Sequence, residues 1–162
     1  MLQKTMNAKD AVSGSLASCT VKLSDGKRYN LMQLYKFEAK YEVGSATVAI
    51  LGKPSKGNKP TGGKGTWSGI AYYNTSVFRL MMLDYKKTGV LPSFDATVTN
   101  EDPTSAAGRQ ITIVKGCLIN SLIIAKYDAS SENPLEEEIN GTFDDWDIET
   151  PFNLLDGMRV GR

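Results

Sequence analysis

Apolar and charged residues alternate along one stretch of the chain. Residues 35–43 alternate without a break, which is the period of a β-strand with one buried face. The strand pattern resumes after Gly44 in residues 47–51 and returns in residues 66–73. The pattern predicts two long strand-like arms.

The first arm is too long for a compact domain. If residues 35–51 form one straight strand, they span roughly 55 Å at about 3.3 Å per residue. A compact chain of this length has a radius of gyration of about 15 Å, hence a diameter of about 40 Å. We therefore expect the arm to overhang its domain and to need cover from another chain, because bare strand edges pair with other strands. The alternative is that Gly44 bends the arm back onto a small barrel.

Residues 52–65 join the two arms and contain five glycines, two prolines and four lysines. They predict a long inter-strand loop, and loops of this length are usually functional or disordered. The loop has no aromatic residue on which a base could stack, and its glycines lack the spacing of a phosphate-binding loop. Two interpretations remain, a solvated loop or an arm that orders when it docks on a neighbouring copy. The candidate inter-ring docking residues are Lys53, Lys56, Lys59 and Lys64.

The remaining pattern predicts strands around a single helix. Residues 17–23 indicate a strand that ends in a tight turn with Gly26, and residues 76–87 indicate a helix with a broad apolar face that stops at Gly89. Further strands are expected at 93–99, at 109–114, at 118–127 as the most apolar and central one, and at 135–148, with a bulge at Gly116.

This arrangement predicts a mainly β fold, an antiparallel β-sandwich or partly open barrel with one packed α-helix and a long extended hairpin. We expect one domain over residues 1–162, with an N-terminal arm at 1–15 and a C-terminal extension at 150–162.

Composition excludes several classes of protein. No apolar run approaches the length of a membrane helix, and no signal-peptide core is present near the start. The two cysteines, Cys19 and Cys117, predict reduced, buried thiols without a disulfide, in a cytosolic product. The chain has no histidine, the commonest general base and zinc ligand, and no phosphate-binding loop, G-x-S-x-G or C-x-x-C motif. We therefore expect no enzyme, no catalytic residue, no cofactor and no metal.

Charge is distributed as a gradient. Residues 1–66 carry a net charge of +7, residues 67–131 of +1 and residues 132–162 of −7. Copies could stack basic surface onto acidic surface, since complementary potentials orient association. Alternatively, the two halves interleave in the fold and their charges cancel locally.

A set of short segments in a fixed order distinguishes the chain. The segments are YKFEAK at 35–40, VAILGK at 48–53, GKGT at 63–66, NEDP at 100–103, GRQ at 108–110, IAKYD at 124–128 and LEEE at 135–138. Together they resemble the tail tube proteins of contractile-tailed phages and phage-like particles, in the PBSX-like group of prophages of Gram-positive bacteria. The resemblance runs from about residue 8 to about residue 149. It does not extend to residues 151–162, whose role stays open.

The resemblance implies a β-sandwich subunit that assembles with itself into hexameric rings, which stack into a tube inside a contractile sheath. It implies sheath, baseplate and tape-measure proteins as partners, a place in the tail of a virion or phage-like particle, assembly in the bacterial cytoplasm, and DNA that passes transiently at most. It also implies that one face of the long strands lines the channel. The candidate channel-wall or interface residues are Lys36, Glu38, Lys40 and Glu42 on one arm, and Glu136, Glu138 and Asp144 on the last strand.

Three other functions remain open. A tube subunit of a type VI-like injection apparatus would share the architecture. A monomeric nucleic-acid-binding β-barrel would use the basic N-terminal half, but it lacks aromatic residues among the lysines. A carboxylate hydrolase would use the acids at 136–138 or 144–147, yet acids in succession along a strand usually face solvent.

Overall fold

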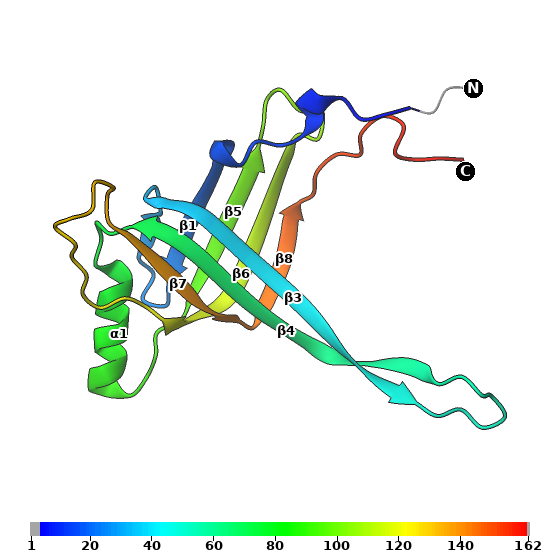
Figure 1. The fold of residues 1–162 in the computed structure, drawn as a ribbon, viewed down its shortest axis with the longest axis horizontal. Helices are drawn as coiled ribbons and strands as arrows, with labels where there is room; N and C mark the ends of the chain where they lie inside the picture. The colour runs from blue at the N-terminus through cyan, green and yellow to red at the C-terminus, as the bar shows by residue number, and fades with distance from the viewer. Residues whose placement is uncertain (1–3, 162) are drawn as a thin grey trace.

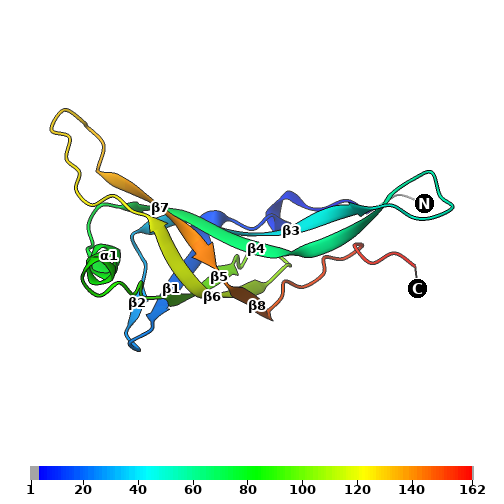
Figure 2. The same ribbon diagram turned by 90° about the horizontal axis from the view of Figure 1, so that it is seen from below.

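A computed structural model describes residues 4–161, whose strands form one antiparallel sheet that bends into two layers (Figures 1 and 2). The strands are β1 (Ala17–Leu23), β2 (Arg28–Asn30), β3 (Leu34–Val48), β4 (Gly57–Tyr72), β5 (Phe94–Glu101), β6 (Arg109–Ser121), β7 (Glu136–Phe143) and β8 (Asp145–Thr150). The helix α1 is Val77–Thr88, and two short 3-10 helices span Ala8–Asp10 and Gly14–Leu16. The strand order is β2-β1-β5-β6-β7-β4-β3, and β8 continues β7 along the same edge of β6.

Strand β6 belongs to both layers. Its first part pairs with β5 and β8 in one layer, called sheet A together with β1 and β2, and its end at 118–121 pairs with β7 in the other layer. Strands β7, β4 and β3 complete this second layer, called sheet B. The pairing shifts register near Gly116, which has φ 67° and donates its N–H to the Asp95 carboxylate. The predicted bulge at Gly116 is therefore confirmed, and it lets one strand turn from sheet A into sheet B.

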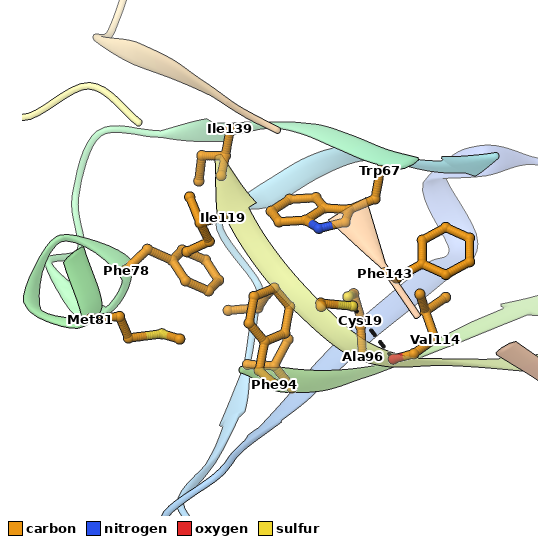
Figure 3. Close-up of a cluster of buried hydrophobic side chains, with 13 residues drawn as sticks. Cys19, Trp67, Phe78, Met81, Phe94, Ala96, Val114, Ile119, Ile139 and Phe143 are labelled. Carbon is orange, nitrogen blue, oxygen red and sulfur yellow. Dashed lines mark hydrogen bonds between the residues drawn. The ribbon is translucent and has the colours of Figure 1, made fainter. Parts of the chain in front are cut away.

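The hydrophobic core lies between the two sheets, and α1 closes one end of it (Figure 3). Trp67 of sheet B meets Phe94 of sheet A edge to face, with ring centroids 5.6 Å apart, and its indole N–H donates to the Leu118 carbonyl. The buried core consists of Cys19, Val21, Leu31, Trp67, Phe78, Met81, Phe94, Ala96, Val114, Cys117, Ile119, Ile139 and Phe143. The predicted fold class is confirmed: a mainly β, open antiparallel arrangement with one packed helix.

The helix ends as predicted but buries less than predicted. Gly89 is left-handed, with φ 78°, and its N–H donates to the Tyr85 carbonyl, which caps the helix. Only Phe78 and Met81 of α1 are buried, while Leu80 is 62% exposed. The apolar face of α1 therefore extends beyond its contact with the core.

Two predicted strands were wrong in extent. The strand expected at 118–127 ends at Ser121, because beyond it the carbonyls of Ile123 and Ile124 accept hydrogen bonds from side chains instead of a neighbouring strand. The last strand, expected as one piece over 135–148, divides into β7 and β8 at Asp144, whose N–H donates to the Lys115 carbonyl. The chain turns from sheet B into sheet A at this residue.

The predicted loop at 52–65 was also wrong in extent, because β4 begins at Gly57. The connection between the arms is residues 49–56, called here the hairpin tip. Gly57 pairs with Val48, so most of the lysine- and glycine-rich stretch is strand. Pro60 is tolerated there because β4 has only β3 as a neighbour at that point.

Both ends of the described chain are tied to the turn between β5 and β6. Asp102 accepts hydrogen bonds from the Ser13 N–H and from the N–H and hydroxyl of Thr104, which lower the pKa of its carboxyl group. Lys4 and Asp156 form an ion pair at 2.6 Å that joins the two terminal segments. The segments predicted as an N-terminal arm and a C-terminal extension therefore lie side by side (Figure 1).

Candidate assembly surfaces

Sheet B has one core-facing side and one outward side, called here the polar face. The register places Lys36 opposite Ile70, which lies opposite Glu138, so their side chains share this side. Six of the seven predicted channel-wall residues lie together on it. Its charged and polar side chains are Lys36, Glu38, Lys40, Glu42, Lys64, Thr66, Ser68, Glu136, Glu138, Asn140 and Thr142, and Ile70 and Tyr72 lie among them.

Asp144 is the exception, and its predicted place beside Glu136 and Glu138 was wrong. It lies at the turn between β7 and β8, and its carboxylate packs over Gly116, where a Cβ would lie 2.9 Å from Oδ2. The alternation that links residues 136, 138 and 142 breaks here because the chain changes sheets.

Charges of both signs mix on the polar face. Lys40 and Glu42 form an ion pair at 2.7 Å, and their hydrogen bond raises the pKa of Lys40 and lowers that of Glu42. Glu136 accepts a hydrogen bond of 2.7 Å from the Tyr35 hydroxyl, which raises the pKa of Tyr35 to about 12. Three lysines and four glutamates leave this face with one net negative charge. The face is therefore nearly neutral, with basic and acidic parts of the sequence interleaved in one sheet.

Strand β7 reaches only as far as Gly65 of β4. From there to the tip, the hairpin of β3 and β4 has no further strand beside it and projects from the domain (Figure 1). The predicted overhang is confirmed, and Gly44 does not fold the arm back. Side chains on its core-facing side lie beyond the core: Tyr41 is 47% and Val43 60% exposed. Trp146 of β8, 42% exposed, lies 5.8 Å from the Tyr41 ring. This apolar strip was missed from the sequence, although the alternation of residues 35–43 already placed Tyr41 and Val43 on one side.

Two glycines allow aromatic rings to lie flat on the hairpin. A Cβ on Gly63 would lie 1.9 Å from the Tyr41 hydroxyl oxygen and 2.0 Å from its ring, and one on Gly65 would lie 2.3 Å from the Phe143 ring. Any larger residue would displace a ring. This contact is the physical reason for glycine inside a strand, where it otherwise weakens pairing.

The four predicted docking lysines separate into two groups. Lys53 and Lys56 are exposed on the hairpin tip, whereas Lys59 and Lys64 are strand residues of β4. Lys64 lies opposite Glu42 on the polar face. A docking role at the tip can therefore involve only the first pair directly.

Within 4–161, no group of three His, Cys, Asp or Glu side chains is placed to hold a metal ion, and no helix has the length and apolar character needed to cross a membrane. Cys19 and Cys117 are free, and burial raises the pKa of their thiols to about 11 and about 12. They are packed core residues that stay protonated at neutral pH.

The fold is that of subunits found in contractile injection systems. A chain in the six-fold symmetrised baseplate structure of the anti-feeding prophage matches with a TM-score of 0.61 at 8% identity, over 91% of this chain and 97% of that one. A chain in the extended sheath–tube complex of the PVC extracellular contractile injection system matches with a TM-score of 0.53 at 14% identity, over 81% of this chain and 87% of that one. These likenesses show the architecture.

Sequence comparison then identifies the family. A family model described as phage tail tube protein matches residues 4–149, so the chain belongs to the phage tail tube family. The PBSX phage-like element protein XkdM of Bacillus subtilis is 33% identical over 151 residues, covering 93% of this chain and 97% of XkdM. The protein YqbM of the same organism is 33% identical over 143 residues, covering 88% of this chain and 93% of YqbM. The resemblance to tail tube proteins that the sequence motifs indicated is confirmed.

Proposed function

We propose that this protein is the inner-tube subunit of a contractile phage or phage-like tail, and that it assembles into hexameric rings that stack into a hollow tube. The observation that carries the proposal is the free edge of sheet B. Strand β3 has 15 residues and, among the described strands, pairs only with β4. An edge of this length recruits another strand unless something covers it.

The opposite end of sheet B offers a partner for that edge. The last residues of β6, 118–121, pair only with β7 in the described part of the chain. Strand β3 of one copy can therefore continue the sheet at the β6 end of the next. This contact joins two different surfaces, so repetition closes a ring when the rotation between copies allows it, and a closed ring has no open edge.

In such a ring the polar face of sheet B lines the channel. Its near-neutral charge gives duplex phosphates no basic surface to bind, so DNA or other cargo passes without lasting attachment. The role is structural and non-enzymatic. Its further partners are the sheath, baseplate and tape-measure proteins. It assembles in the bacterial cytoplasm and becomes part of the particle's tail.

Electron microscopy of the concentrated, purified full-length protein tests this proposal. We expect rings with sixfold symmetry and tubes built from them. A uniform 17.7 kDa monomer at high concentration would refute the proposal. A shift of duplex DNA by that monomer would instead favour the nucleic-acid-binding alternative, whose basic surface would have to be the hairpin.

A further inference from the structure

Two exposed segments lie at opposite ends of the molecule. The hairpin tip, residues 49–56, forms one end of the longest axis, and residues 122–135 between β6 and β7, called here the β6–β7 segment, project from the other end (Figures 1 and 2). Copies shifted along this axis bring the tip of one copy to the β6–β7 segment of the next.

The hairpin tip carries exposed lysines and exposed apolar side chains. Leu51 is fully exposed and Ile50 is 42% exposed, and Lys53 and Lys56 are exposed beside them. No Asp or Glu occurs between residues 43 and 83. The tip therefore carries positive charge that no acidic neighbour in the hairpin balances.

A groove of about 310 Å³ lies where the β6–β7 segment meets the start of β7. The carboxylates of Asp128 and Glu136 line it, with the Tyr72 ring beside them. Asp128 accepts hydrogen bonds from the N–H and hydroxyl of Ser130, which lower the pKa of its carboxyl group. Glu136 is held by the hydroxyl of Tyr35. Both acidic groups of the groove are thus fixed in place.

The rest of the groove region also complements the tip. Tyr127 and Ile124 of the β6–β7 segment are 90% and 66% exposed, which provides an apolar surface. Lys126 is the only basic residue lining the groove, and its ammonium group donates a hydrogen bond of 2.8 Å to the backbone carbonyl of Glu136. The base of the segment is held by Arg79, which donates to the Ile123 carbonyl. Such prior ordering reduces the entropy cost of binding.

We propose that this groove receives the hairpin tip of a second copy of the chain. Lys53 and Lys56 lie against Asp128 and Glu136, and Leu51 packs on Tyr127. The inference rests on the proposed function, because it names the acceptor on the neighbouring subunit. A contact between unlike surfaces at opposite ends continues from copy to copy, as elongation of a tube requires.

Disulfide trapping tests the acceptor. The full-length chain with Leu51→Cys and Tyr127→Cys should give a ladder of covalent multimers when assembled protein is oxidised, since the hairpin tip and the β6–β7 segment lie at opposite ends of one copy (Figure 1) and the native thiols are buried. The matched control combines Leu51→Cys with Leu80→Cys, an exposed position on α1 away from the groove. Rings or tubes without a 51–127 ladder, or an equal ladder in the control, would overturn this acceptor and leave the proposed function standing. Absence of any assembly by the unaltered chain would refute the proposed function itself.

Charge exchange gives a second measurement on the same chain. Asp128→Lys or Lys53→Asp should lower the ladder yield about fivefold to tenfold, and combining them should restore most of it. Glu132→Lys makes the same change of charge in the same segment but outside the groove lining, and we expect it to leave the yield nearly unchanged. Equal losses from Asp128→Lys and Glu132→Lys, or no recovery in the combined variant, would show that another surface or another protein occupies the groove.

Discussion

Arg79 joins three parts of the fold, and its removal should destabilise the protein strongly. The guanidinium group donates to the Glu137 carboxylate at 2.5 Å, to the Ile123 carbonyl at 3.1 Å and to the Thr75 carbonyl. It also lies 4.2 Å from the centre of the Tyr73 ring. Helix α1, strand β7 and the β6–β7 segment are thus linked through one side chain.

Replacing Arg79 by Met keeps much of the apolar stem and removes the charge. The Arg79 and Glu137 side chains are 15% and 2% exposed, so the substitution leaves a buried carboxylate without its partner. Loss of one member of a buried pair costs about 3–5 kcal/mol. For a domain of this size about 1 kcal/mol lowers Tm by about 2–4 °C, so we expect Tm to fall by about 6–20 °C. Thermal unfolding of unassembled protein, followed by circular dichroism, measures this.

The double variant Arg79→Met/Glu137→Met distinguishes an unpaired charge from lost packing. We expect it to recover most of the lost stability, because apolar residues of similar size often replace a buried ion pair without loss. Arg109→Met is the matched control on an exposed arginine, where a change within about 0.5 kcal/mol is expected. If Arg79→Met shifts Tm no more than Arg109→Met does, the ion pair does not stabilise the fold as argued.

Three further predictions concern the hairpin, the termini and the thiols. Gly65→Ala should destabilise the fold by about 1–3 kcal/mol in denaturant unfolding because it displaces a buried ring, whereas Gly63→Ala should cost less because the ring above it is half exposed; equal costs would contradict this. The lowered pKa of Asp102 means that its contribution to stability is present above the unfolded pKa of about 3.9 and is lost as pH falls through the folded pKa. Stability followed from pH 5 to pH 2 should therefore fall less steeply in Asp102→Asn than in the unaltered chain, and parallel curves would refute this role. Cys19 and Cys117 should react with a thiol reagent at pH 8 only after unfolding, and rapid labelling of native protein would contradict their burial.

The sequence predicted the faces of the long strands because side-chain direction depends only on the period of a strand. Lys36 and Glu38 point outward and Phe37 inward once residues 35–43 are known to be extended. The sequence also predicted the helix end at Gly89 and the bulge at Gly116. A positive φ at these positions depends only on the glycine itself and its immediate neighbours.

The sequence did not predict the start of β4 at Gly57, because residues 57–65 have the composition of a loop. Their strand conformation comes from pairing with β3 and from the rings that lie over Gly63 and Gly65, and both contacts join residues far apart in the sequence. The prediction of a strand past Ser121 was wrong because the composition there is that of a strand but no partner strand lies beside it. Side chains donate hydrogen bonds to the carbonyls of Ile123 and Ile124 instead.

By itself, the sequence determined the mainly β class, the two faces of the overhanging arm and the membership in the tail tube family, since these depend on local periodicity and on the order of short motifs. The tertiary structure alone decided which charges share a surface. It brought Glu136 and Glu138 of β7 beside the lysines of β3 and β4, and it placed Asp144 at the turn between the sheets. The reason is that strand register and a change of sheet are set by contacts between distant segments, which no local pattern records.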